Sequence, residues 1–358
     1  MTGSPRPVNP PSALLTAASV VVVVAGIRAA EALVVPFLVA AFLALIGAPP
    51  VFWLKRRRVP SVAAVFLVVG SMVAVGLALG AVIGTSLNDF TQALPAYQAR
   101  LQEEMGALAR WLGGWGVSVS AQALLDYVDP GAAMRVVART LSRVTGVLTN
   151  TFLILLTVVF ILLEVSSFPH KVRLAVRDPE GTLERFGAVA HSLKTYLTIK
   201  TWVSLATGVL AWALLWAVGV DFPVLWAMVA FLLNFVPSLG SILAAVPPVL
   251  LGFVQFGVGR ALLVAAGYLA INVLMGNAVE PRLMGRGLGL SPLIVFLSLV
   301  FWGWALGPVG MLLSVPLTMT LKIALEATEE TRWLAVLLDS ERSVELAVRA
   351  RGGGGPES

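Results

Sequence analysis

Two apolar stretches of this chain are each interrupted by proline and glycine, and the interruptions match in position. The first stretch covers residues 222–256 and breaks at Val236-Pro237-Ser238-Leu239-Gly240, and the second covers 289–325 and breaks at Gly307-Pro308-Val309-Gly310. Corresponding residues lie 69 or 70 positions apart (Pro223 and Pro292, Pro247 and Pro316, Gly240 and Gly310). Paired apolar segments with such interruptions are the best sequence marker of a transporter's binding site. The pattern predicts a transport core at 195–325.

Composition places the chain in a lipid bilayer. Of its 358 residues, 58% are hydrophobic and 12% charged, whereas soluble domains carry about 25% charged residues. The net charge is +6, but the basic residues lie between apolar runs, which is typical of topology signals and not of a nucleic-acid surface. With no cysteine and two histidines, we expect no cofactor and no metal site.

About eight hydrophobic segments predict an all-α polytopic integral membrane protein. Six are unbroken and approach the ~20 residues that a crossing needs: 12–27, 33–54, 61–85, 147–165, 195–218 and 261–279. The densest positive cluster, Lys55-Arg56-Arg57-Arg58, lies between the second and third of these segments. Because short basic loops stay cytoplasmic, the cluster also places the N-terminus in the cytoplasm.

The remaining segments follow from this orientation. We expect a cytoplasmic tail (1–11), three transmembrane helices (12–85), an extracytoplasmic amphipathic segment (86–143), a fourth crossing (144–166), a cytoplasmic loop (167–194), the transport core (195–325) and a cytoplasmic tail with a disordered end (326–358). The amphipathic segment should break at Trp111–Gly116 and serve as a cap or an oligomer contact. Gly76, Gly80 and Gly84 share one helix face and either pack a neighbouring helix or reflect the abundance of glycine in membrane helices.

The broken units decide the topology of the core. Their first halves, 223–236 and 292–306, are about 14–15 residues long, which is too short to cross. If both units are re-entrant hairpins, Arg282, Arg286 and Lys322 face the cytoplasm, whereas one kinked crossing helix per unit would place Arg282 and Arg286 outside. The positive-inside rule favours hairpins, and each repeat then has an odd number of crossings, which makes the two repeats inverted.

Polar residues near the two breaks are the candidate substrate or ion pathway, since backbone outside a helix at membrane depth must face protein or water. They are Asn234, Pro237, Ser238, Gly240, Ser241, Asn272, Asn277, Glu280, Arg282, Gly307, Pro308 and Gly310. Taken singly, each polar side chain could merely join two helices, and their clustering favours the pathway. Glu280 is either a functional carboxylate or an interfacial partner of Arg282. Lys200 falls in the first turns of its predicted span, where it can snorkel.

Three motifs resemble those of one family. Asn277–Pro292, Asn234–Gly240 and Gly307–Pro316 are similar to the motifs of the autoinducer-2 exporter family of bacterial permeases, and the resemblance covers roughly Pro10 to Ala327. It implies an oligomeric inner-membrane transporter with about eight hydrophobic segments. Proteins of this family are described as exporters of the furanone autoinducer-2 or as sodium(lithium)/proton antiporters. Ser238 stands where many relatives carry an aromatic or small residue, so it supports no choice of substrate.

The resulting prediction is a secondary transporter that moves a small solute, with autoinducer-2 as one candidate, across the bacterial inner membrane. A cation/proton antiporter is the first alternative, with Glu280 as its best-placed carboxylate. A scaffold or passive channel, assembled as a homo-oligomer, is an alternative from another class. No Walker-type phosphate loop indicates a nucleotide-driven pump, and no constellation of nucleophile and base indicates an enzyme.

Overall fold

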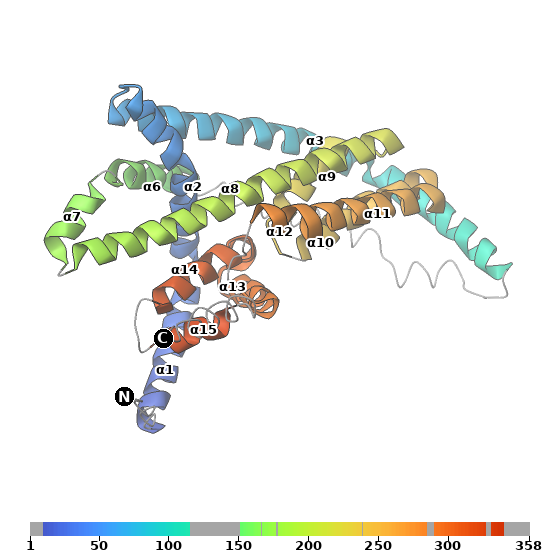
Figure 1. Ribbon diagram of the computed structural model, residues 1–358. Coiled ribbons are helices and arrows are strands. Elements are labelled where there is room, and N and C mark those ends of the chain that lie inside the picture. Colours follow the sequence, from blue (N-terminus) through green and yellow to red (C-terminus); the bar gives the residue numbers. More distant parts are fainter. Residues whose placement is uncertain are drawn as a thin grey trace, which may run out of the picture.

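A computed structural model describes residues 10–114, 151–165, 167–176, 178–237, 239–284, 290–326 and 331–339, and all regular structure within them is helical (Figure 1). Six of these helices are long and apolar enough to cross a membrane, or seven if α6 and α7, bent by 66°, form one span. This confirms the all-α polytopic fold. The helices are α1 (Pro10–Ala29), α2 (Glu31–Arg56), α3 (Ser61–Gly113), α6 (Thr151–Glu164), α7 (Phe168–Ala175), α8 (Pro179–Val218), α9 (Pro223–Leu233), α10 (Leu239–Phe256), α11 (Val258–Asn272), η2 (Val273–Val279), α12 (Glu280–Leu283), α13 (Pro292–Leu312), α14 (Ser314–Glu326) and α15 (Arg332–Leu338).

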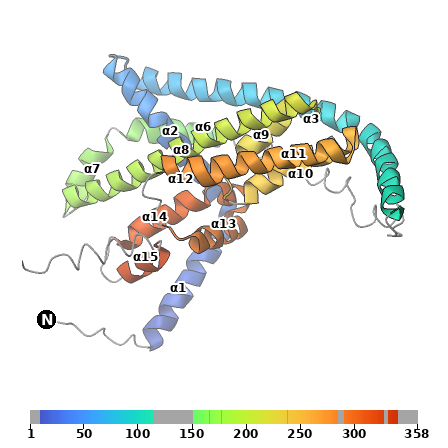
Figure 2. The same ribbon diagram turned by 45° about the vertical axis from the view of Figure 1, so that its right-hand side comes forward.

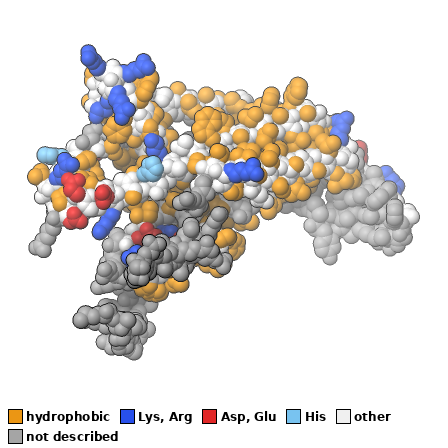
Figure 3. All heavy atoms as spheres, viewed as in Figure 1, with side chains coloured by type: hydrophobic (Ala, Val, Ile, Leu, Met, Phe, Trp, Pro, Cys, Tyr) orange, Lys and Arg blue, Asp and Glu red, His pale blue; other side chains and the backbone are white. Residues whose placement is uncertain are grey.

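The exterior is apolar, as a bilayer requires. Large hydrophobic side chains such as Trp202, Leu262 and Leu293 are exposed, and hydrophobic atoms cover much of the face along α8 and α11 (Figure 3). The two ribbon views agree that α8 and α11 run side by side (Figure 1 and Figure 2). Lys and Arg side chains gather instead at the corner where α2 meets α3 (Figure 3).

The third helix is longer than the sequence predicts. We expected a span ending at Thr85, but α3 continues to Gly113 and is 53 residues long in total, about 80 Å. The amphipathic stretch after Thr85 keeps a helical period, so the helix continues with Pro95 inside it and ends at Gly113, within the predicted break. The rest of the segment up to residue 143, the first nine residues and the glycine-rich tail lie outside the described residues.

The proposed packing face of α3 meets nothing in the described chain. Cβ atoms placed on Gly76, Gly80 and Gly84 would have no described atom within 4 Å. Elsewhere α3 packs closely, with Val65 and Val69 against α2 and α6 and with Phe90 against Trp226 of α9. The glycine face is therefore open within one subunit, and its role as an oligomer contact stays a prediction.

Helix α8 also begins earlier than expected. Asp178 caps its first turn, since the Asp178 carboxylate accepts a hydrogen bond from the Gly181 N–H. The helix then runs 40 residues, through the segment predicted as loop and the segment predicted as span. Lys200 consequently lies in the middle of α8 and not in its first turns, and its side chain is buried instead of snorkelling to an interface.

The first broken unit is a hairpin. Its two ends meet, since the Asp221 N–H donates to Gln255 Oε1 across 3.2 Å and Gln255 Nε2 donates to the Asp221 carboxylate. The turn at its tip is tight, because a Cβ on Gly240 would lie 1.7 Å from the Leu233 carbonyl oxygen. α9 is only 11 residues long, about 16 Å, which is roughly half of the hydrocarbon thickness.

The second unit also folds back. α13 turns at Gly307, whose φ of 63° and ψ of −153° leave the helical region. A Cβ on Gly310 would lie 2.0 Å from the Trp302 carbonyl oxygen, and Trp302 Nε1 donates to Thr318 Oγ1 of α14 across 3.0 Å. At the other end of the unit, Leu290 packs in one cluster with Met319.

The two hairpins open toward different ends of α8. Val220, at the base of the first hairpin, packs with Leu215 near the end of α8, whereas Leu290, at the base of the second, packs with Leu193 and Leu197 in its first half. This arrangement is compatible with an inverted repeat. Whether the two units are re-entrant or cross the membrane stays a prediction, since Leu239–Phe256 and Pro292–Leu312 are each long and apolar enough to span.

Candidate transport site

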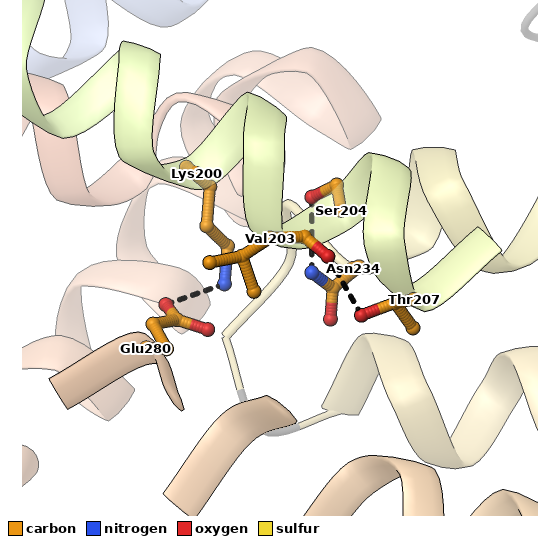
Figure 4. Close-up of polar contacts among 6 residues, drawn as sticks. All are labelled: Lys200, Val203, Ser204, Thr207, Asn234 and Glu280. Atoms are coloured by element: carbon orange, nitrogen blue, oxygen red, sulfur yellow. Dashed lines mark hydrogen bonds and ion pairs between the residues drawn. The ribbon is translucent and has the colours of Figure 1, made fainter. Parts of the chain in front are cut away.

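A polar stripe on one face of α8 is the starting point of the site. Lys200, Ser204 and Thr207 are all buried, with 5%, 0% and 4% of their surface exposed. Their spacing of four and three residues puts them on a single helix face, directed at the first hairpin and at α12 (Figure 4). Thr207 satisfies its hydroxyl within the helix by donating to the Val203 carbonyl oxygen across 2.9 Å. Lys200 and Ser204 instead bond to other segments.

The tip of the first hairpin is tied to this stripe. Asn234 Nδ2 donates to Ser204 Oγ across 2.9 Å (Figure 4). Asn234 follows the last residue of α9, so the bond fixes where the first leg of the hairpin ends on α8. Pro237 and Ser241 are half-buried in this turn, and Ser238 lies outside the described residues. The tip therefore presents an amide and backbone groups to the middle of the long helix.

One helical turn away on α8, a buried ion pair joins the stripe to α12. Lys200 Nζ donates to Glu280 Oε1 across 2.7 Å, and 6% and 19% of the two side chains are exposed (Figure 4). Taking two charges out of water costs several kcal/mol per ion, so such pairs survive where geometry is good or function requires them.

The partner of Glu280 differs from the one expected. The sequence suggested Arg282, but residues two apart on a helix point to different sides, and Arg282 is exposed. Lys200 reaches Glu280 because α12 packs against α8.

The helix that carries Glu280 is irregular just before it. Residues Val273–Val279 form a π-helical segment, a rare geometry that is frequent at functional sites. Asn272 is half-buried at its start and Asn277 is exposed. The described chain gives neither Asn277 nor Arg282 a hydrogen bond or an ion pair. Of the candidates on this helix, Glu280 is the one that bonds to α8, through Lys200.

The tip of the second hairpin lies elsewhere. Gly307 and Pro308 follow Trp304, which stacks under the Arg28 guanidinium of α1 at 4.2 Å, and Glu31 Oε1 of α2 would lie 3.1 Å from a Cβ on Gly307. α13 packs against α1, α2 and α14. No hydrogen bond or ion pair between the two tips occurs in the described part of the chain. The assignment of residues at both breaks to one pathway stays a prediction.

A second polar cluster closes the base of the first hairpin. Tyr97 Oη of α3 donates to Asp221 Oδ2 across 2.6 Å, and Gln255 bonds to the same carboxylate. The sequence analysis did not connect Tyr97 with Asp221. It also omitted Ser204 and Thr207, although polar residues at helical spacing in an apolar span were a usable signal. Among the described residues no group of three His, Asp or Glu side chains could hold a metal ion.

A polytopic helical protein with a buried polar site at the tip of a helical hairpin has the architecture of a membrane transporter. The chain belongs to the AI-2E transporter family, whose sequence model matches residues 17–330. It is similar to the AI-2 transport protein TqsA of Escherichia coli, with 46% identity over 318 residues that cover 89% of this chain and 92% of TqsA. It is also similar to YhhT of Escherichia coli, which is provisionally named a transport protein. The identity to YhhT is 39% over 329 residues, which cover 92% of this chain and 94% of YhhT.

Proposed function

We propose that this protein is a secondary transporter that moves a small polar solute of the autoinducer-2 type across the bacterial inner membrane. The observation that carries the proposal is the Asn234–Ser204 contact beside the Lys200–Glu280 pair, at the place where a hairpin tip meets the middle of α8. A furanone with hydroxyl groups needs both donors and acceptors, which amide, hydroxyl, ammonium and carboxylate groups supply together. The name of the relative TqsA supports autoinducer-2 as the first solute to test.

Transport in this proposal uses movement of the first hairpin relative to α8. The opposed placement of the two hairpins supports an inverted repeat, which is a common basis for alternating access. The Asn234–Ser204 bond is a neutral hydrogen bond, worth about 1 kcal/mol net, so it can exchange for a bond to a solute at little cost. Gly307, Pro308 and Gly310 would then form the turn of the opposite hairpin and not the solute site.

A sodium(lithium)/proton antiporter is the second candidate, and Glu280 is the observation that favours it. A coupling carboxylate must exchange a proton for a cation, and the Glu280 side chain is only 19% exposed. Its charge is already compensated by Lys200, however, so a bound cation would have to displace an ammonium group. This argument favours a solute transporter in which the ion pair positions α12 against α8.

Purified full-length protein in proteoliposomes tests the proposal. We expect saturable autoinducer-2 flux that the Asn234→Ala variant weakens, and no Na⁺- or Li⁺-dependent proton movement. Saturable cation/proton exchange without autoinducer-2 flux would establish the antiporter instead. Flux that rises linearly with solute concentration would indicate a passive channel. We further propose a multi-pass subunit in the inner membrane with both termini cytoplasmic, assembled as a homo-oligomer.

A further inference from the structure

A groove between α2, α6 and the first half of α8 lies apart from the proposed transport site. Its volume is about 610 Å³, and it is partly open to the surroundings. Small side chains make its floor, with Ala44 buried and Ala48 half-buried, and the exposed ring of Phe52 stands beside them. Neither Lys200 nor Glu280 lines it.

The charged side chains that line this groove are basic. Arg56 of α2 and His191 and Lys194 of α8 line it, no acidic residue does, and its other lining side chains are apolar or aromatic. The three side chains are exposed. Within the described residues, neither Arg56 nor Lys194 has a hydrogen bond or ion pair. Two cations from different helices thus converge on one apolar surface, and no described residue supplies a counterion.

The groove also sits on the strongly basic side of the molecule. Arg56 belongs to the cluster Lys55–Arg58 at the α2–α3 corner, where Figure 3 shows Lys and Arg side chains gathered. By the positive-inside rule this corner faces the cytoplasm. Basic pockets between transmembrane helices on that side bind the head groups of anionic lipids.

We propose that this groove binds an anionic phospholipid of the cytoplasmic leaflet. The phosphate contacts Arg56 and Lys194, with the guanidinium fork of Arg56 suited to two phosphate oxygens. An acyl chain lies over Ala44 and Ala48 and against Phe52, where it buries apolar surface of both partners. A free phosphate would leave that apolar surface uncovered. The ammonium group of a zwitterionic lipid would lie near Arg56 and Lys194, which repel it.

Native mass spectrometry of the full-length protein in detergent tests this. We expect phosphatidylglycerol to bind at least tenfold more tightly than phosphatidylcholine. Arg56→Gln and Lys194→Gln should each weaken phosphatidylglycerol binding about fivefold, the effect of one basic residue at an anionic membrane surface. Arg185→Gln is the matched control, because Arg185 is an exposed basic residue of the same helix that does not line the groove, and it should keep the affinity of the unmodified protein.

A filling variant separates the lipid from other occupants. Ala48→Trp should weaken binding of both lipids by blocking the floor, while its melting temperature shows whether the fold is intact. Inorganic phosphate at equal concentration should not displace phosphatidylglycerol. Equal binding of the two lipids, displacement by phosphate, or an unchanged affinity in the Arg56→Gln/Lys194→Gln double variant would each overturn the proposal. The last result would also be seen if a second copy of the chain covered the groove.

Discussion

Gly240 and Gly310 occupy equivalent places in the two hairpins. A Cβ on Gly240 would lie 1.7 Å from the Leu233 carbonyl oxygen, and one on Gly310 would lie 2.0 Å from the Trp302 carbonyl oxygen. Both distances are far below van der Waals contact, and in each case the obstructing atom belongs to the backbone. The two interruptions recognised in the sequence are therefore the same physical device, a turn closed so tightly that only a hydrogen fits.

Even a methyl group at either turn should open the hairpin. We expect Gly240→Ala and Gly310→Ala to reduce flux at least tenfold, since the backbone must move to relieve the clash. Flux in proteoliposomes, at matched amounts of inserted protein, measures this. Gly187→Ala on α8 is the control, because a Cβ there meets nothing within 4 Å. Normal flux in both hairpin variants would mean that the turns are unrelated to transport.

Replacing only one partner of the Lys200–Glu280 pair should lower the stability of the protein. Lys200→Met leaves an uncompensated carboxylate with little exposure, and we expect a loss of about 3–5 kcal/mol in the free energy of unfolding. Denaturant unfolding followed by circular dichroism measures it.

The double variant Lys200→Met/Glu280→Leu separates structure from transport. It should recover most of that stability, because two apolar side chains replace both charges. If the pair only holds α12 against α8, flux should return with stability, whereas a stable but inactive double variant would place the charges in the transport pathway. Glu280→Gln should retain residual saturable transport, and complete loss of flux in a well-folded Glu280→Gln protein would favour the antiporter.

Asn234 should affect solute affinity more than stability. We expect Asn234→Ala and Ser204→Ala to raise the KM for the solute about tenfold while the free energy of unfolding falls by about 1 kcal/mol. Thr207→Val provides a control on the same face of α8, since the Thr207 hydroxyl bonds within its own helix. A KM that stays at the value of the unmodified protein in both variants would remove this contact from the pathway.

The bond from Tyr97 should stabilise the base of the first hairpin. Tyr97→Phe removes a hydrogen bond to a carboxylate, worth about 1.5–3 kcal/mol, and should lower the melting temperature. Thr91→Val, which removes an exposed hydroxyl bonded to the Asn88 carbonyl oxygen of α3 itself, should leave it unchanged. Equal melting temperatures for the Tyr97→Phe variant and the unmodified protein would show that α3 is not tied to the hairpin there.

Labelling of single-cysteine variants can determine the membrane topology, because the chain contains no native cysteine. Arg260→Cys, in the first turn of α11, should react with an impermeant thiol reagent from outside. Arg185→Cys and Arg332→Cys should react only from the cytoplasm. All three positions are exposed, so access depends on the side of the membrane and not on burial. Labelling of Arg260→Cys from the cytoplasm alone would contradict the proposed orientation of the hairpin.

Helix content, membrane class and the two breaks could all be predicted from the sequence, because they depend on local properties. Apolar runs of sufficient length must be helical in lipid, and proline with glycine interrupts them wherever they occur. The family motifs followed from the same local information. Helix ends were less predictable, as α3 and α8 show, since polar residues that keep a helical period extend a helix beyond the apolar part of a span.

The partners of the polar side chains were decided by the tertiary structure alone. Glu280 pairs with Lys200, 80 positions away along the chain, because the packing of α12 on α8 brings them together. The sequence offered Arg282 as the neighbour, and helix geometry turns that side chain away. Tyr97 likewise meets Asp221 across 124 positions. Proline and glycine act on their own backbone and can be recognised where they stand, whereas a charge or a hydroxyl acquires its role from whichever helix packs against it.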